Sequence, residues 1–175
     1  FLDTPDVTIC RRSTDIAKLA AGSGIVIAER LIRGEVANGF VLVRPPGHHA
    51  ETEVAQGFCL FNNISILARY LQREHGLEKI LIVDWDVHHG DGTQHTFDES
   101  PNVFFCSIHQ SPHYPGTGAA VERGTGAGEG EGERGCPGTA GGPEAEEEAQ
   151  KEDTSYPMLA ARKVRKVLES NDAEQ

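Results

Sequence analysis

The sequence has no closely spaced pair of cysteines. Its four cysteines lie far apart along the chain, at Cys10, Cys59, Cys106 and Cys136. This spacing argues against a disulfide framework and against a structural zinc knuckle, which needs pairs of the CxxC type. We therefore predict a protein of a reducing, intracellular compartment, either cytoplasmic or nuclear.

Long hydrophobic runs are also missing. No apolar stretch approaches the roughly 18 residues that a membrane-spanning helix requires. The first residues, FLDTPDVT, lack the basic region and following apolar region of a secretory signal. We predict no membrane partner. Because residue 1 is Phe rather than Met, we expect a processed or cut N-terminus.

Basic residues are scarce relative to acidic ones. The chain has 16 Lys and Arg against 27 Asp and Glu, which gives a formal net charge of −11. Because phosphate binding requires a basic face, this balance predicts no direct binding of nucleic acid. It is compatible with a basic protein or peptide as partner.

The chain is long enough to form one domain. Its 175 residues, 38% of them hydrophobic, are too few for two well-packed domains. Apolar periodicity predicts helices over residues 13–34 and 62–76. The first helix has candidate caps at residues 13–15, and the second at Asn62 or Asn63.

Short apolar stretches predict buried strands over residues 40–43, 79–84 and 103–108, with a short helix over 93–97. Strands alternate with helices, and the strands are continuously apolar. This pattern predicts an α/β fold with three layers, α/β/α, in which helices cover both faces of a mainly parallel sheet.

Each predicted strand is followed by a polar cluster. The clusters are RPPGHHAE after Val43, DWDVHHGDG after Val83 and HQSPHYPGTG after Ile108. In open parallel sheets the ligand sites lie outside the carboxyl ends of the strands. We therefore expect the three clusters to meet at one edge of the sheet.

The second cluster contains a candidate metal site. Alternate side chains of an extended segment share a face, so Asp84, Asp86 and His88 are expected to point together. Carboxylate and imidazole form a ligand set for zinc or, with more oxygen ligands, for manganese. An isolated DxDxH pattern is more often a capped turn with solvated acids, but a second histidine pair elsewhere in the chain favours the metal.

That second pair is His48 and His49. Adjacent histidines at a strand end, after a Pro-Pro-Gly turn, can supply a general base and a general acid near neutral pH. Each needs an aspartate to hold its tautomer, and Asp84 and Asp91 are available. The competing interpretation is an ordinary core or surface role for each histidine.

Four motifs carry a family resemblance. RPPGHHAE, GFCLFNN, VDWDVHHGDGTQ and HYPGTG, in this order, resemble the catalytic core of the zinc-dependent histone deacetylase family, which also contains acetylpolyamine amidohydrolases and acetoin-utilisation proteins. The Trp in the third motif is more similar to the class II branch. Manganese ureohydrolases are a rival with a related fold, but the GHHA pair and GFCLFNN favour the deacetylases. The resemblance covers residues 1–130.

The resemblance implies roles for the candidate metal-binding and catalytic residues. Asp86 and His88 would be two of the zinc ligands. His48 and His49 would be the histidine pair beside the metal, with Asp84 oriented toward the first. Asp91 would be oriented toward the second histidine in the same way.

The resemblance also implies a substrate channel and a second ion. Gly57, Phe58 and Tyr114 would line the channel, where the two rings grip the methylene stem of an acetyl-lysine. A monovalent cation, usually potassium, would lie beneath the zinc on the following residues: Asp84, Asp86, His88, Ser107 and Ile108. The competing interpretation for the two rings is ordinary packing.

The sequence departs from the family after residue 130. The third zinc ligand of the family, an aspartate, and its oxyanion-stabilising tyrosine have no counterpart in family context. Residues 131–153 form a Gly- and Glu-rich low-complexity segment, and residues 154–175 are predicted to be a short amphipathic helix and tail. An acidic loop ahead of FLDTP is also expected to be missing, so we predict a catalytic domain that is truncated at both ends.

The sequence therefore predicts hydrolysis of N-acetyl amides, on acetyl-lysine in histones or other proteins, by the parent domain. We expect this chain alone to be an inactive fragment that associates through an exposed sheet edge. One alternative is a non-catalytic, deacetylase-like binding module. Another is a deacetylase of acetylated polyamines or small metabolites.

Overall fold

The structure is a computed structural model that describes residues 1–119. The predicted low-complexity segment and the predicted helix over 154–175 lie outside the described residues. Within residues 1–119 the helices and strands are α1 (Ser13–Ile32), α2 (Asn63–His75), β1 (Ile80–Asp84), α3 (Asp91–Phe97) and β2 (Val103–Ser107). None of these helices has the length and apolar character needed to cross a membrane.

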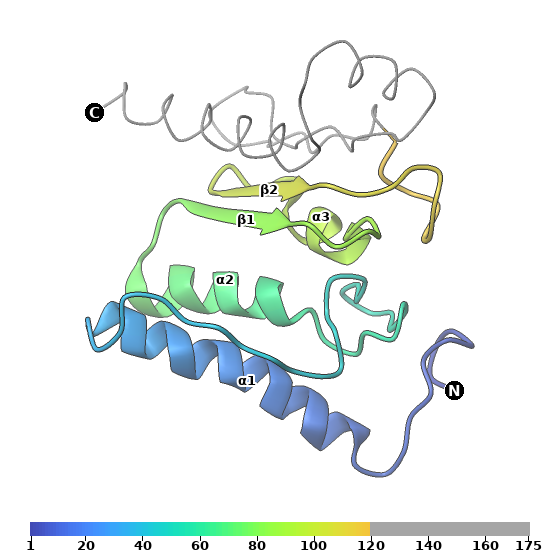
Figure 1. The fold of residues 1–175 in the computed structure, drawn as a ribbon, viewed down its shortest axis with the longest axis horizontal. Coiled ribbons are helices and arrows are strands. Elements are labelled where there is room, and N and C mark those ends of the chain that lie inside the picture. The colour runs from blue at the N-terminus through green and yellow to red at the C-terminus, as the bar shows by residue number, and fades with distance from the viewer. Residues whose placement is uncertain (120–175) are drawn as a thin grey trace, which may run out of the picture.

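The two strands form a parallel pair. β1 and β2 run side by side with Ile80 opposite Val103 and Asp84 opposite Ser107, and the chain crosses between them through α3 (Figure 1). A parallel pair requires such a crossover, because the chain must return to the same end of the sheet. The predicted parallel α/β arrangement is therefore present.

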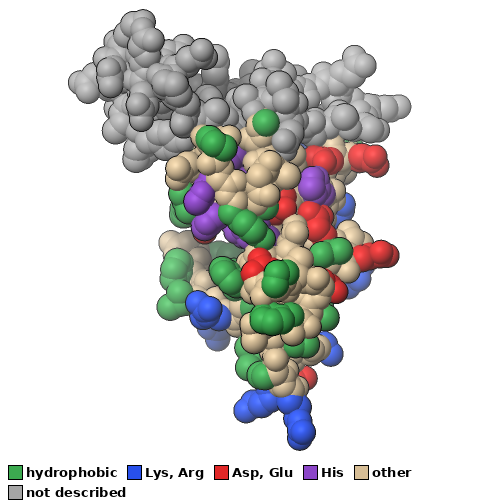
Figure 2. Space-filling model, turned by 90° about the vertical axis from the view of Figure 1, so that its right-hand side faces the viewer, with side chains coloured by type: hydrophobic (Ala, Val, Ile, Leu, Met, Phe, Trp, Pro, Cys, Tyr) green, Lys and Arg blue, Asp and Glu red, His purple; other side chains and the backbone are tan. Residues whose placement is uncertain are grey.

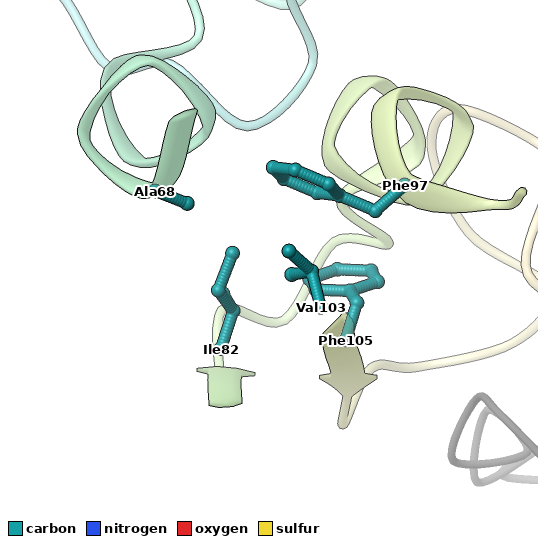
Figure 3. Packing of buried hydrophobic residues seen from close by; sticks show 5 residues of the cluster. All are labelled: Ala68, Ile82, Phe97, Val103 and Phe105. Carbon is teal, nitrogen blue, oxygen red and sulfur yellow. The ribbon is translucent and has the colours of Figure 1, made fainter. Parts of the chain in front are cut away.

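One face of this sheet is covered by helices. The hydrophobic cluster joins side chains from both strands to one residue of α2 and one of α3 (Figure 3). Its members are Ala68, Ile82, Phe97, Val103 and Phe105. The strand members share a face because side chains alternate along a strand. In Figure 1, α1 lies beyond α2, on the side away from the strands.

Local sequence signals explain the bounds of α2. The side chain of Asn62 accepts a hydrogen bond from the backbone N–H of Ser65 at 3.1 Å, as an N-cap does. Gly76 ends the helix with a left-handed φ of 64°, which glycine adopts without steric cost. Both bounds agree with the sequence prediction.

The caps predicted for α1 are wrong, although the helix itself is present. Its N-cap is Arg12, without a side-chain hydrogen bond. The hydroxyl of Ser13 instead accepts a hydrogen bond from the backbone N–H of Cys10, at 2.9 Å. Later in α1, the carboxylate of Glu29 accepts a hydrogen bond from the hydroxyl of Tyr70 at 2.7 Å, which joins α1 to α2.

The predicted buried strand over residues 40–43 is also wrong. These residues form no strand, and Phe40 and Leu42 are 84% and 89% exposed. A strand needs a neighbour to accept and donate its backbone hydrogen bonds. Within the described residues β1 pairs only with β2, so no strand lies beside residues 40–43.

Candidate active site

The structure brings the three polar clusters together. The ring centres of His48 and His49 lie 4.0 Å apart, and His49 lies 6.0 Å from His88 and 5.0 Å from Tyr114. His48 and His49 precede α2, His88 follows β1 and Tyr114 follows β2. Figure 2 shows histidine side chains gathered on one face, with acidic side chains nearby.

His48 is paired with Asp84, the last residue of β1. His48 Nδ1 lies 2.8 Å from Asp84 Oδ2. Burial lowers the pKa of His48, but the hydrogen bond and charge of Asp84, with the nearby carboxylates, outweigh it, so that the pKa is raised. Because a carboxylate only accepts, Nδ1 carries the proton and Nε2 of the neutral ring is left as the acceptor.

His49 is paired with Asp91 in the same way, but deeper. His49 Nδ1 lies 2.7 Å from Asp91 Oδ1, and both residues are buried. The second carboxylate oxygen of Asp91 accepts a hydrogen bond from Gln56 Nε2 at 2.9 Å. The carboxylate is therefore held from two sides, which fixes the ring of His49. Sequence reasoning missed Gln56.

Asp86 and His88 present their ligand atoms side by side. Asp86 Oδ1 lies 2.8 Å from His88 Nδ1 and also accepts the backbone N–H of His88 at 2.8 Å. Burial raises the pKa of Asp86, but the hydrogen bonds from His88 and the nearby imidazoles outweigh it, so that the pKa is lowered. A charged carboxylate beside an imidazole nitrogen is a donor set that fits zinc.

Asp86 and His88 supply two zinc ligands, and the described part of the chain supplies no third. Within residues 1–119 no group of three or more His, Cys, Asp or Glu side chains is arranged to hold a metal ion. A catalytic zinc site normally takes three protein ligands. Asp86 and His88 therefore match part of such a site.

Gly57 and Phe58 form a turn against His49. Both residues have positive φ angles, 57° and 64°. A Cβ atom on Gly57 would overlap the His49 ring, so only glycine fits there. The turn leaves Phe58 64% exposed.

Asp6 connects this turn to Tyr114. One carboxylate oxygen of Asp6 accepts the backbone N–H of Gly57 at 2.9 Å and the hydroxyl of Tyr114 at 3.1 Å. Burial and the hydrogen bond to Asp6 raise the pKa of Tyr114 to about 12. The hydroxyl of Thr4 also donates to Asp6, and these donors lower the pKa of Asp6 despite its partial burial. Sequence reasoning assigned no role to Asp6.

The residues predicted for a monovalent cation also lie together. Ser107 is the strand partner of Asp84, and the backbone N–H of Ile108 donates to the Asp84 carbonyl at 2.8 Å. Ser107 is buried. Hydroxyl and carbonyl oxygens at two adjacent strand ends are hard ligands, so the residues present fit an alkali cation.

Two further histidines were missed by sequence reasoning. His89 and His109 are both buried, with ring centres 4.6 Å apart. His89 directly follows His88, and His109 lies two residues after Ser107, hence on the same face of the extended chain. The positions of His89 and His109 relative to His88 and Ser107 were the sequence signal that could have identified them.

The comparison with known families shows the family of this chain. A family model described as Histone deacetylase domain matches residues 2–160. The chain belongs to the histone deacetylase family. The resemblance carried by the four motifs is thereby confirmed.

Relatives agree with this membership. Histone deacetylase 7 of Homo sapiens is 47% identical over 132 residues, which are 74% of this chain and 14% of the relative. A probable deacetylase of Archaeoglobus fulgidus is 50% identical over 116 residues, 66% of this chain and 32% of the relative. The chain thus spans less than half the length of each of these relatives.

A solved structure confirms the fold class. The crystal structure of the HDA15 HD domain superposes with a TM-score of 0.72 at 45% identity, covering 80% of this chain and 40% of that chain. This chain therefore has the α/β fold of the histone deacetylase family. The domain bounds predicted at residues 130 and 153 stay predictions.

Proposed function

We propose that this histone deacetylase chain carries part of a zinc-dependent site for hydrolysis of N-acetyl amides, with acetyl-lysine on histones or other proteins as substrate. The observation that carries the proposal is the arrangement of two His–Asp pairs around Asp86 and His88. We further propose an intracellular location, cytoplasmic or nuclear, and an acetylated protein or peptide as partner.

Asp86 and His88 would hold the zinc ion. When bound, zinc supplies Lewis-acid polarisation of the acetyl carbonyl. Asp84, Asp86, His88, Ser107 and Ile108 would hold potassium beneath it. The oxygen atoms at the two strand ends support this second ion.

The two histidines would move the protons. Each has Nδ1 held by a carboxylate, so each offers Nε2 to the reacting groups. One imidazole takes a proton from the attacking water, and a proton returns to the nitrogen of the leaving amine as the C–N bond breaks. Acetate and a free amine are the products.

Phe58 and Tyr114 would hold the substrate. Phe58 and Tyr114 are exposed, at 64% and 42% respectively, and the ring centre of Tyr114 lies 5.0 Å from that of His49. The hydroxyl of Tyr114 is engaged by Asp6, which leaves the apolar ring for the methylene stem of a lysine. Apolar walls with few polar groups are typical of sites for such side chains.

We propose that this chain alone is inactive. The two-ligand set within residues 1–119 supports weak zinc binding. The same observation favours a second candidate function, a non-catalytic deacetylase-like module that acts through its surface. The two candidates differ in whether zinc binds tightly.

Zinc content and zinc affinity of the purified chain test the proposal. The variants are Asp86→Ala and His88→Ala. His95→Ala is the control, because His95 is an exposed histidine that lies on α3 and contacts Glu51. We expect weak zinc binding that both site variants abolish and the control retains. Zinc binding that is unchanged in both site variants would overturn the assignment.

Turnover of an acetyl-lysine peptide tests the predicted inactivity. We expect no zinc-dependent release of acetate by this chain. Measurable turnover that is lost in His88→Ala would show that a complete site forms, and would overturn the inactivity.

A further inference from the structure

The proposed reaction makes no use of the buried pair His89 and His109. Their exposed fractions are 1% and 3%. Buried imidazoles need hydrogen-bond partners for their ring nitrogens, and these partners connect two parts of the site. The pair contacts Thr117 and Gly118, at the end of the segment 110–118 that follows β2.

The hydrogen bonds of His109 orient the hydroxyl of Ser107. His109 Nε2 lies 2.9 Å from the carbonyl oxygen of Gly118, and Nδ1 lies 2.9 Å from Ser107 Oγ. A carbonyl oxygen only accepts, so Nε2 carries the proton, and Nδ1 of the neutral ring accepts. The hydroxyl of Ser107 therefore donates to His109, and its oxygen lone pairs remain for a cation.

His89 contacts the same segment through Thr117. Its Nδ1 lies 2.8 Å from Thr117 Oγ1, and its Nε2 lies 2.9 Å from Gln94 Oε1 of α3. Gly118 has a φ of +83°, and a Cβ there would overlap both histidine rings. The end of the segment 110–118 therefore packs closely against His89 and His109. The same segment carries Tyr114.

We propose that His109 is a positioning residue that couples the monovalent-cation site at Ser107 to the segment 110–118. The inference rests on the proposed function for its cation site. When potassium occupies the oxygen of Ser107, it favours the hydroxyl orientation that bonds to His109, and His109 holds Gly118. Because such coupling is reciprocal, order in the segment and cation affinity support each other.

Hydrogen exchange of the backbone amides in residues 110–118 tests the coupling. The full chain is measured in potassium chloride and in tetramethylammonium chloride at equal ionic strength, since the second cation is too large for the site. We expect potassium to slow exchange in this segment by about fivefold or more. His109→Phe and Ser107→Ala are expected to lose this response.

Gln110→Ala is the matched control, because Gln110 is an exposed polar residue of the same segment. It should keep the potassium response. A merely structural role of His109 would raise exchange equally in both salts and leave the response to potassium intact, which would overturn the proposal. If His109→Phe does not fold, His109→Gln decides, because it removes the imidazole bridge between Ser107 and Gly118 and leaves the ligand oxygen of Ser107 in place.

Zinc content, measured on the same samples, separates this inference from the proposed function. A potassium response that depends on His109 in a chain without zinc would support the coupling and count against the zinc chemistry. Zinc binding by Asp86 and His88 with no potassium response would overturn the coupling and leave the zinc proposal standing.

Discussion

The carboxylate of Asp6 accepts a hydrogen bond from the hydroxyl of Tyr114, 108 residues further along the chain, at 3.1 Å. The same oxygen accepts the backbone N–H of Gly57 at 2.9 Å. One aspartate near the N-terminus thus joins the two sides of the candidate substrate channel.

Replacing Tyr114 with Phe removes one donor to Asp6 and keeps the ring. We expect the free energy of unfolding at neutral pH to fall by about 1 kcal/mol, the size of one partly exposed hydrogen bond. The pKa of Asp6 is lowered from its ordinary value of 3.8 in the folded protein. The Asp6 carboxylate therefore stabilises the fold at pH values above 3.8, and this stabilisation is lost as the pH falls through the lowered pKa.

Urea unfolding of wild type and Tyr114→Phe checks this prediction. The difference in unfolding free energy should shrink in acid, once Asp6 is protonated. A difference that is the same at neutral and acidic pH would show that the hydroxyl does not act through the Asp6 charge.

Asp91→Ala should be far more destabilising than Asp86→Ala. Asp91 is buried and bonded to both His49 and Gln56, so its removal leaves buried polar groups without partners, at a cost of about 3 kcal/mol. Asp86 is half exposed, and its loss should cost less than about 1 kcal/mol. Urea unfolding of both variants in the absence of metal measures the contrast, and equal costs would contradict it.

Gly57→Ala and Gly22→Ala should change stability in opposite directions. Gly57 has a positive φ and has no space for a Cβ beside His49, so alanine should cost about 2 kcal/mol or more. Gly22 lies inside α1 with nothing within 4 Å of a Cβ, so alanine should gain about 0.5–1 kcal/mol. Thermal unfolding of the two variants tests both signs, and stabilisation by Gly57→Ala would refute the close contact with His49.

Stability should depend on pH through His95. Burial lowers the pKa of His95, but the hydrogen bond and charge of Glu51, with nearby carboxylates, outweigh it and raise the pKa above its ordinary value of 6.5. A raised pKa means that the stabilisation is fully present below 6.5 and is lost as the pH rises through the folded-state pKa.

His95→Gln isolates this effect. The variant should be less stable than wild type at pH values below 6.5, and close to it at pH values well above the folded-state pKa, where His95 is neutral in both states. Glu51→Gln should give the same profile, because it removes the other partner. A pH-independent difference would show that the pair contributes through packing alone.

The sequence by itself predicted the elements whose signals are local. Asn62 and Gly76 fix the bounds of α2 because capping and the left-handed end residue depend only on neighbouring backbone groups. The resemblance carried by the motifs also placed His48, His49 and Asp91 in one site, although the strand predicted ahead of His48 does not form. Family membership was carried by the same motifs.

Only the tertiary structure decided which segments found partners. Residues 40–43 have the composition of a strand, but a strand forms only beside another one, and no described residues supply it. The bonds from Asp6 to Tyr114 and from His109 to Gly118 likewise depend on where the folded chain brings distant backbone together. Hydrogen-bond geometry between residues far apart in sequence is set by packing, so no pattern within one short stretch encodes it.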